Sequence, residues 1–280
     1  MEANTLIGTT VIVTGAGRGM GKSMSLALAR AGANIAMLDI DEEVLVEAEI
    51  EIKNASGEGM VKSLICDVAN PQDANSAVKE TISTFGSVDV LVNNAVVGPE
   101  RIPGYFVNKT KFWKLNDDLW NSMLRVNIFG THLMAKTCVP HMISRGWGRI
   151  INITTSFDTM YLPGAGAYGP TKAAIEAHTR VMAQDLDGTG VTANILIPGG
   201  PVNTRMIPKA SGIPRKNLIQ PEIMQKPVTW LASQESDGIT SMRFIAALWD
   251  HTLSSSEKIE KAGFPAAWTQ IPSVAIYPPD

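Results

Sequence analysis

The chain has 280 residues, of which 45% are hydrophobic and 18% charged, with 24 Lys and Arg against 27 Asp and Glu. A formal charge of -3 gives no long-range cationic field, so we expect neither nucleic acid nor a membrane surface as a partner. No uncharged apolar run approaches the roughly 18 residues that span a bilayer, and Glu2 stands where a secretory peptide carries basic residues. The chain is therefore expected to be globular and cytosolic. Its two cysteines, Cys66 and Cys138, are too few for a disulfide framework and are interpreted as buried hydrophobic residues.

Apolar strand-like runs alternate with longer helical patterns from residue 10 to about residue 250. The predicted strands are Thr10–Thr14, Asn34–Leu38, Val61–Ile65, Asp89–Asn93, Arg149–Thr154, Val191–Ile197 and Thr240–Phe244. The predicted helices cover residues 19–31, 42–55, 70–85, 117–145, 168–187 and 221–235. This alternation predicts a single α/β domain over residues 1–250, a doubly wound parallel sheet with helices on both faces.

Three segments rich in Pro, Gly or aromatic residues interrupt the alternation, at residues 96–116, 198–220 and 250–280. The first two directly follow predicted strands, and open α/β sheets bind ligands beyond the carboxyl ends of their strands. They are therefore candidate substrate-facing loops. The extension 251–280 carries Phe264, Trp268 and Tyr277, so we expect it to pack on the same or a neighbouring subunit.

A glycine-rich loop, Gly15-Ala-Gly-Arg-Gly19-Met-Gly21, joins the first predicted strand to the first predicted helix. Glycine lets the backbone turn tightly and lets a phosphate approach the free N–H groups at a helix N-terminus. The loop therefore predicts a diphosphate-binding site. Two alternatives remain: a purely structural turn, and a P-loop that would need glycine where Ala16 stands.

Asp39 ends the second predicted strand, 20 residues after Gly19. A dinucleotide fold places a carboxylate there to accept the adenosine ribose hydroxyls, and this carboxylate would repel a 2′-phosphate. NAD is accordingly expected rather than NADP, although Asp39 could instead be a helix cap and Arg18 could partly neutralise a 2′-phosphate. Asp67 after the third strand either reaches the adenine amino group or is a turn residue.

Tyr168-Gly-Pro-Thr-Lys172 opens a predicted helix, and its i,i+4 spacing places the phenol and the ammonium on one face. A neighbouring cation favours phenolate, so Tyr168 is a candidate general acid/base. The fifth predicted strand ends in hydroxyl residues, and Thr155 lies 13 residues before Tyr168. A hydroxyl at that place could hold the oxygen of a substrate carbonyl.

Together these motifs resemble the short-chain dehydrogenase/reductase family over about residues 5–250, with a Rossmann-type sheet. The resemblance rests on the glycine loop, Asp39, Cys66-Asp67-Val68, Asn93-Asn94-Ala95, Asn127, Tyr168 with Lys172, and Pro198-Gly199 followed by Thr204.

The resemblance implies a catalytic set of Asn127, Thr155, Tyr168 and Lys172, in which Lys172 depresses the pKa of Tyr168 and Asn127 holds a proton-relay water. Thr155, Ser156, Phe157 and Tyr168 would contact the substrate. The implied cofactor-binding residues are Gly15, Arg18, Gly19, Met20, Gly21, Asp39, Asp67, Val68, Asn94, Ala95, Tyr168, Lys172, Pro198, Gly199, Val202 and Thr204.

Four features of the sequence depart from the family pattern. Thr155 replaces a serine, with Ser156 adjacent, so either hydroxyl could orient the substrate. Val96 replaces a glycine, the Pro198–Thr204 segment is one residue longer, and the chain continues about 30 residues past Asp250.

We therefore expect an NAD(P)-dependent oxidoreductase that interconverts a secondary alcohol and a ketone, hydride moving to or from nicotinamide C4 while Tyr168 moves the proton. The alternatives are a catalytically weak dinucleotide-binding sensor or scaffold of the same fold, and a P-loop-like nucleotidase. No metal is expected, because the four histidines lack metal-ligand spacing. The resemblance also implies a homodimer or homotetramer acting on a small molecule.

Overall fold

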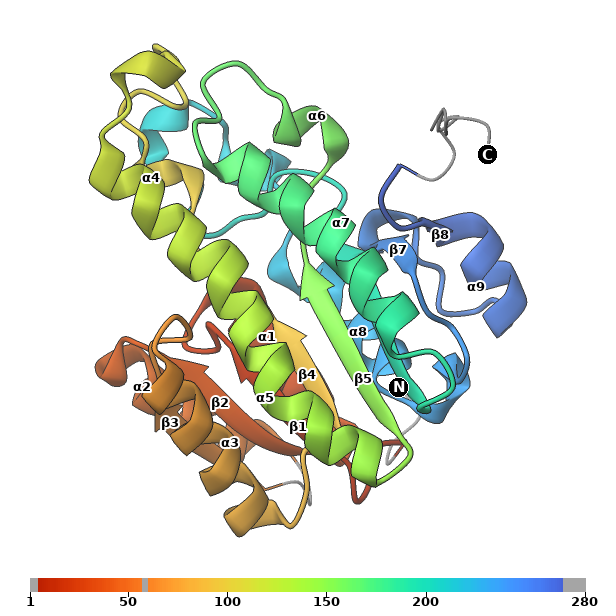
Figure 1. Ribbon diagram of the computed structural model, residues 1–280. Coiled ribbons are helices and arrows are strands. Elements are labelled where there is room, and N and C mark those ends of the chain that lie inside the picture. The colour runs from red at the N-terminus through yellow and green to blue at the C-terminus, as the bar shows by residue number, and fades with distance from the viewer. Residues whose placement is uncertain (1–4, 57–59, 269–280) are drawn as a thin grey trace, which may run out of the picture.

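The computed structural model describes residues 5–56 and 60–268. Within these ranges, eight strands form one sheet in the order β3-β2-β1-β4-β5-β6-β7-β8 (Figure 1). All neighbouring strands pair in parallel except β8, which is antiparallel to β7. The strands are β1 Thr10–Thr14, β2 Asn34–Asp39, β3 Val61–Ile65, β4 Val90–Asn93, β5 Gly148–Ile153, β6 Val191–Ile197, β7 Met242–Ile245 and β8 Gly263–Pro265. The strand order reverses at β1 and β4, where sheets of this type open a ligand crevice.

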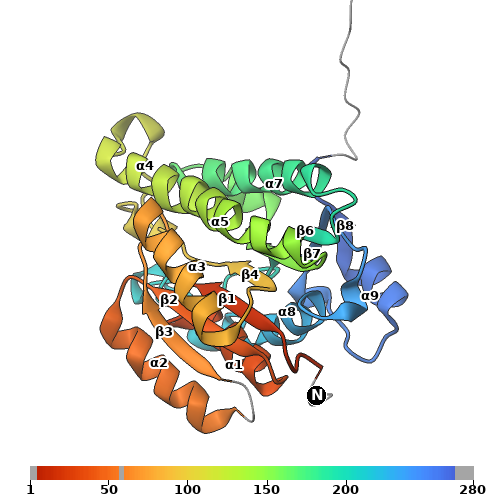
Figure 2. The ribbon, with the colours of Figure 1, turned by 60° about the horizontal axis from the view of Figure 1, so that its bottom comes forward.

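Helices cover both faces of the sheet, as the sequence predicts: α1, α2 and α8 lie on one face and α3, α5 and α7 on the other (Figure 2). The helices are α1 Gly19–Arg30, α2 Glu42–Ala55, α3 Pro71–Phe85, α4 Asp117–Met123, α5 Thr131–Ser144, α6 Phe157–Met160, α7 Tyr168–Asp185, α8 Gln225–Leu231 and α9 Ser255–Ala262. Successive side chains of β1 point to opposite faces of the sheet and so contribute to both hydrophobic cores. Val11 and Val13 pack with α1, whereas Ile12 packs toward α3 and α5. Cys66 and Cys138 are buried and free.

Local sequence signals set the ends of α3. The Asn70 side chain accepts a hydrogen bond from Gln72 N, and Pro71 occupies the first turn, where its missing N–H is not needed. Gly86 ends the helix in the left-handed conformation at φ 86°. The helix therefore begins and ends where the sequence places its signals.

Buried amide side chains connect the carboxyl ends of the central strands. The Asn93 amide donates to Asn152 Oδ1 at 2.9 Å, and the Asn152 amide donates to Thr179 Oγ1 on α7 at 2.9 Å. Asn94 donates to the carbonyl oxygens of Thr14 and Gly15, both at 3.0 Å. These bonds fix β1, β4, β5 and α7 relative to one another just below the edge where ligands bind.

Three predicted elements differ clearly from the structure. The helix expected over 221–235 is a 3₁₀ turn at Pro221–Met224 followed by the shorter α8, Gln225–Leu231. The helix expected over 117–145 is divided into α4, a π-helical turn at Leu124–Gly130 and α5. The helix widens where Gly130 packs against Val68. The strand expected to start at Thr240 starts at Met242, because Ser241 has φ 60° and cannot continue an extended run.

The segment after Asp250 folds back on the same chain as far as the structure describes it. Its helix α9 begins at a capping box made by Ser254 and Glu257, and β8 extends the sheet beside β7. Tyr277 lies outside the described residues. Over the described ranges, no helix is long and apolar enough to cross a membrane.

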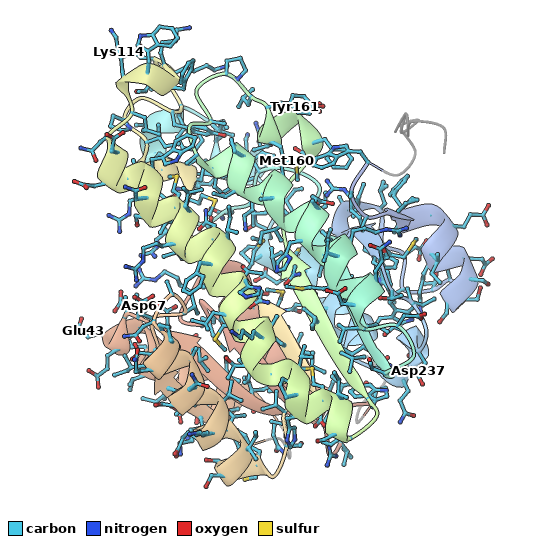
Figure 3. The ribbon with its side chains drawn as sticks, in the orientation of Figure 1. Glu43, Asp67, Lys114, Met160, Tyr161 and Asp237 are labelled. Carbon is cyan, nitrogen blue, oxygen red and sulfur yellow. The ribbon has the colours of Figure 1, made fainter. Side chains whose placement is uncertain are left out.

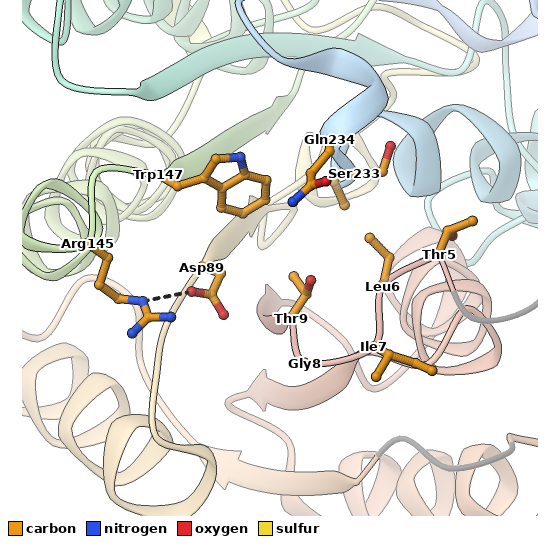
Figure 4. A pocket seen from close by; sticks show the side chains of 11 residues that line it. Thr5, Leu6, Ile7, Gly8, Thr9, Asp89, Arg145, Trp147, Ser233 and Gln234 are labelled. Carbon is orange, nitrogen blue, oxygen red and sulfur yellow. Dashed lines mark hydrogen bonds and ion pairs between the residues drawn. The ribbon is translucent and has the colours of Figure 1, made fainter.

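A cavity of about 380 Å³ lies at the amino ends of β1 and β4, the opposite edge from the crevice (Figure 4). Its buried carboxylate, Asp89, accepts bonds from Thr10 N at 2.8 Å, Ser87 Oγ at 2.6 Å and Arg145 Nε at 3.3 Å. Because these bonds satisfy both oxygens of Asp89, we interpret this carboxylate as part of the framework.

Asn152→Ala is expected to lower the free energy of unfolding by about 2–4 kcal/mol, because it removes two buried hydrogen bonds and leaves Asn93 without its partner. Urea unfolding followed by circular dichroism measures this loss. Asn75→Ala, which removes one exposed bond to Pro71, serves as the control and should cost less than about 0.5 kcal/mol. Equal losses in the two variants would contradict the proposed role of the amide network.

Candidate active site

The glycine loop between β1 and α1 has a shape that side chains would obstruct. Gly15 and Gly19 have φ of 63° and 56°, in the left-handed region. A Cβ on Gly21 would lie 2.1 Å from Gly15 O. The loop therefore exposes backbone and the N-terminus of α1 to the adjoining crevice, a geometry suited to a diphosphate.

Asp39 at the end of β2 is held in place by backbone donors. Its Oδ2 accepts from Gly17 N at 3.0 Å, and its Oδ1 accepts from Ile40 N at 2.8 Å and Asp41 N at 3.2 Å. Arg18 forms an ion pair with Asp41. The guanidinium nearest the predicted ribose site is thus already engaged by a carboxylate.

A cavity of about 680 Å³ connects these elements and extends from Asp39 and Asp67 to Glu100 and Met206. Of the predicted cofactor-binding residues, those lining it are Gly15, Arg18, Gly19, Met20, Asp39, Asp67, Val68, Asn94, Ala95 and Thr204. Those outside its lining are Gly21, Tyr168, Lys172, Pro198, Gly199 and Val202. The glycine loop, the ribose-side carboxylate and the volume together fit an extended dinucleotide.

Asp67 lines the cavity and also stabilises a turn, because its Oδ1 accepts from Ala69 N at 2.9 Å. Thr204 lines the cavity next to the glycine loop, with its Cγ2 about 3.1 Å from where a Cβ on Gly19 would be. Gly199, at φ 97°, packs against Ala247. The Pro198–Thr204 segment therefore reaches the glycine loop through Thr204, despite its additional residue.

Tyr168 begins α7 and is only 6% exposed. Burial raises the pKa of its phenol well above the ordinary value of 10, Tyr105 and Glu100 raise it further, and the Thr155 side chain opposes part of the rise. The sequence leads us to expect a lowered pKa instead. That expectation includes the neighbouring cation, which lowers the pKa of a phenol, but it omits burial, which raises the pKa by removing water from the phenol.

Lys172 is also buried, and its ammonium donates to Ile153 O at 2.8 Å, at the end of β5. Burial lowers the pKa of Lys172 to about 8, while the charge of Glu176 acts in the opposite direction. The i,i+4 spacing thus places Lys172 one helical turn behind Tyr168, with its charge directed toward the strand end.

The two candidate hydroxyls separate clearly. Ser156 caps α6: its Oγ accepts from Thr159 N and lies 2.8 Å from Thr159 Oγ1. Thr155 lies beside the Tyr168 phenol and affects its pKa. The geometry favours Thr155 as the hydroxyl available to a substrate.

Asn127 lies in the π-helical turn and connects three elements. Its amide donates to Val97 O at 3.1 Å and to Thr171 Oγ1 at 3.0 Å, and its Oδ1 accepts from Val97 N at 2.8 Å. Its side chain thus attaches the segment after β4 to α7. The water-holding role that the resemblance implies for Asn127 stays a prediction.

A buried ion pair that sequence reasoning missed lies next to the predicted catalytic residues Lys172 and Thr155. The carboxylate of Glu176 is fully buried and accepts from Arg243 Nη1 at 2.5 Å and from Thr154 Oγ1 at 2.6 Å. Arg243 also donates to Thr155 O at 2.8 Å and lies 4.3 Å from the centre of the Phe157 ring. The signal was a glutamate four residues after Lys172, on the same helix face.

The ion pair also lies close to the segment that follows β8. Phe157, which is predicted to contact substrate, packs its ring face against the Arg243 guanidinium, and its ring centroid lies 6.1 Å from that of Trp268.

In the parts of the chain that the structure describes, no three His, Cys, Asp or Glu side chains group as a metal site.

The sequence model of the short chain dehydrogenase family matches residues 9–212, and the chain belongs to this family. A short-chain type dehydrogenase/reductase of Picea abies is 36% identical over 154 residues, 54% of each chain. A 3-oxoacyl-[acyl-carrier-protein] reductase, FabG, of Thermotoga maritima is 28% identical over 198 residues, 68% of this chain and 77% of the relative. Among solved structures, NAD+-bound xylitol dehydrogenase superposes with a TM-score of 0.71 at 24% identity, covering 84% of this chain and 96% of the other.

These comparisons show an oxidoreductase family and its fold. The xylitol dehydrogenase structure was solved with NAD+ and, at 24% identity, shows the fold that the two proteins share. The chain spans about half the length of the Picea abies relative that it matches. The Thermotoga maritima relative is named for a 3-oxoacyl-[acyl-carrier-protein] and the solved structure for xylitol, so the shared fold does not select one substrate.

Glu176→Leu is expected to lower the free energy of unfolding by about 3–5 kcal/mol, because it leaves the Arg243 guanidinium buried without its carboxylate. The double variant Glu176→Leu, Arg243→Met removes both charges and should recover most of that loss. Chemical unfolding of the three proteins measures the difference. A double variant as unstable as the single variant would show that the pair itself stabilises the fold.

Proposed function

We propose that the chain is an NAD-dependent oxidoreductase that interconverts a secondary alcohol and a ketone. One observation carries the proposal: the Thr155 side chain lies beside the Tyr168 phenol at the end of β5, with Lys172 held one turn behind. A hydroxyl and a phenol at one place can hold and protonate the same substrate oxygen. A nicotinamide bound in the adjoining cavity would supply the hydride chemistry.

The proton transfer follows from the positions of these groups. In the reducing direction, Tyr168 Oη gives its proton to the carbonyl oxygen, and Thr155 Oγ1 donates a hydrogen bond to that oxygen. In the oxidising direction, Tyr168 Oη takes the proton of the substrate hydroxyl. Lys172 contributes a positive charge behind the phenol, and Arg243 is a positioning residue because it holds Thr155 O.

The preference for NAD is supported by two carboxylates at the ribose end. Asp39 is fixed by three backbone donors and leaves little room for a negatively charged phosphate. Arg18, which could otherwise compensate such a phosphate, is paired with Asp41. The cofactor-binding roles of Val68, Asn94, Ala95, Pro198, Gly199 and Val202 remain part of the same proposal.

The two alternative functions have less support. The P-loop alternative fails on the family assignment, and Lys22 forms an ion pair with Glu51. The sensor alternative predicts tight NADH binding without turnover of any alcohol. We also propose a cytosolic location and a homo-oligomer.

Tyr168→Phe is expected to reduce turnover by about 10²–10⁴-fold while leaving NADH affinity nearly unchanged, because it removes the proton donor and no group of the cofactor cavity. Steady-state rates with a panel of secondary alcohols and ketones, together with NADH fluorescence titration, measure both effects. Strong residual turnover would refute the role of Tyr168.

Thr155→Ala and Ser156→Ala provide a matched pair for this test. Thr155→Ala should lower kcat at least about tenfold through the lost hydrogen bond to the reacting oxygen. Ser156→Ala should mainly weaken the cap of α6. The opposite order would reassign the substrate-orienting hydroxyl.

Asp39→Ala is expected to weaken NADH binding about tenfold and to bring NADPH affinity close to that of NADH, since the carboxylate that accepts the ribose hydroxyls is lost. Fluorescence titration with both cofactors measures the ratio. Glu43→Ala, which removes an exposed carboxylate of α2, is the control and should leave the affinities for NADH and NADPH each within about threefold of the parent. An unchanged NADH to NADPH ratio in Asp39→Ala would show that Asp39 only fixes the backbone.

A further inference from the structure

The two loops beside the cavity mouth carry an unusual concentration of positive charge. Residues 96–116 and 198–220 together contain eight Lys and Arg and one acidic residue, Glu100. The cations are Arg101, Lys109, Lys111, Lys114, Arg205, Lys209, Arg215 and Lys216. Because the whole chain has a charge of -3, the acidic excess must lie elsewhere.

All eight side chains are exposed. None of them forms an ion pair with an acidic side chain in the part of the chain that the structure describes. By contrast, Lys22, Lys53 and Lys62 on the α1 to β3 side each pair with a glutamate. The charge of the loops is therefore available to an anionic partner.

Large apolar side chains are exposed between these cations. Phe112 is 74% exposed, Trp113 66% and Val107 66%. Their loop is well structured, because Gly104 O accepts from the backbone N–H groups of residues 107, 108 and 109 at 2.7–3.0 Å. Ile102 and Tyr105 of the same loop are buried beneath. The loop thus has its own apolar interior and still directs an aromatic pair outward.

Neighbouring segments extend this surface. A Cβ on Gly164 would lie 2.8 Å from Lys109 Cβ, so the loop adjoins the turn after α6, where Tyr161 is 70% exposed. A Cβ on Gly98 would lie 2.7 Å from Met206 Cε, which joins the loop to the second basic segment. Lys114 and Tyr161 lie at the end of the molecule toward which β5 points (Figure 3).

We propose that this basic-aromatic face, defined by Lys109, Lys111, Phe112, Trp113, Lys114 and Tyr161, binds the surface of an anionic lipid bilayer. Lysine side chains attract anionic headgroups, and aromatic rings are favoured at the boundary between headgroups and acyl chains. Lys209 and Lys216 are exposed on the second loop, which contacts the first through Met206 and Gly98. The expectation of no membrane partner rests on the net charge of the whole chain. That sum does not reveal the local cluster of cations on this face.

The composition of the face favours a bilayer over an acidic protein. Protein interfaces are enriched in Arg and depleted in Lys, whereas all three cations of the face, Lys109, Lys111 and Lys114, are lysines. One of the three loop arginines, Arg215, is engaged within the protein, donating to Asn203 Oδ1 and Thr204 O at 3.1 Å. A cofactor phosphate does not explain the face either, because none of its six residues lines the cavity.

The position of the face has a consequence for the substrate, which rests on the proposed function. Glu100 and Arg101 of the first loop and Arg205 and Met206 of the second line the cavity mouth. Binding through the face would set that mouth against the bilayer. A lipophilic alcohol or ketone could then enter from the membrane.

The test is cosedimentation of the full chain with phosphatidylcholine vesicles, with and without phosphatidylserine, at about 0.1 and 0.5 M salt. The variants are Lys111→Glu, Lys114→Glu together and Phe112→Ala, Trp113→Ala together. The control, Lys53→Glu, Lys79→Glu together, makes the same charge change on α2 and α3. All six side chains are exposed, so each variant is expected to fold.

The parent and the control should bind phosphatidylserine vesicles, with affinity falling about tenfold or more at the higher salt. The lysine variant should lose at least about tenfold and the aromatic variant at least about threefold. Three outcomes would overturn the proposal: equal binding to both vesicle types, an equal loss in the control, or no vesicle binding while the aromatic variant forms a smaller oligomer. None depends on turnover, so failure of the proposed function would leave this result interpretable.

Discussion

Buried amide side chains hold the carboxyl ends of β1, β4 and β5 in fixed relation, and the whole site depends on this constraint. Asn93 and Asn152 are register partners on adjacent strands and are bonded through their side chains. Asn94 is bonded to the start of the glycine loop. Each chemically important segment leaves the sheet just beyond these bonds, so the amides set the distance between cofactor cavity and reacting groups. An amide left unpaired there would carry a desolvation cost as well as a loss of position.

The packing that positions Tyr168 and Lys172 also removes water from them, and this loss of water shifts the pKa of both side chains. Burial raises the pKa of the phenol and lowers the pKa of Lys172 to about 8. The two shifts have one physical cause, since low polarity disfavours the charged form of each group. Glu176 partly counteracts the shift of Lys172, and Arg243 in turn compensates Glu176. The reacting groups therefore belong to a chain of buried charges that ends at Arg243 and Thr155 O.

The sequence predicts the repeating frame well, because apolar runs and caps are local signals. The strands β1, β3 and β6 have the predicted bounds, and α2 spans the predicted residues. The features that it misses involve long-range contacts: the π-helical turn ends at Gly130, which packs against Val68, and the Glu176–Arg243 pair joins residues 67 positions apart. Lys172 illustrates the same limit, because its spacing from Tyr168 is visible in the sequence but its bond to Ile153 O is not.

The net charge of a sequence does not describe how charge is distributed over the surface of the folded protein. A net charge of -3 is a sum, and a sum contains no positions. In this fold the strands and helices form the frame, whereas the segments after β4 and β6 are free to vary in composition. Both segments leave the same edge of the sheet, so residues about 100 positions apart contribute to one surface, as Gly98 and Met206 show. Local concentrations of charge near a ligand crevice therefore follow from topology, and whole-chain averages conceal them.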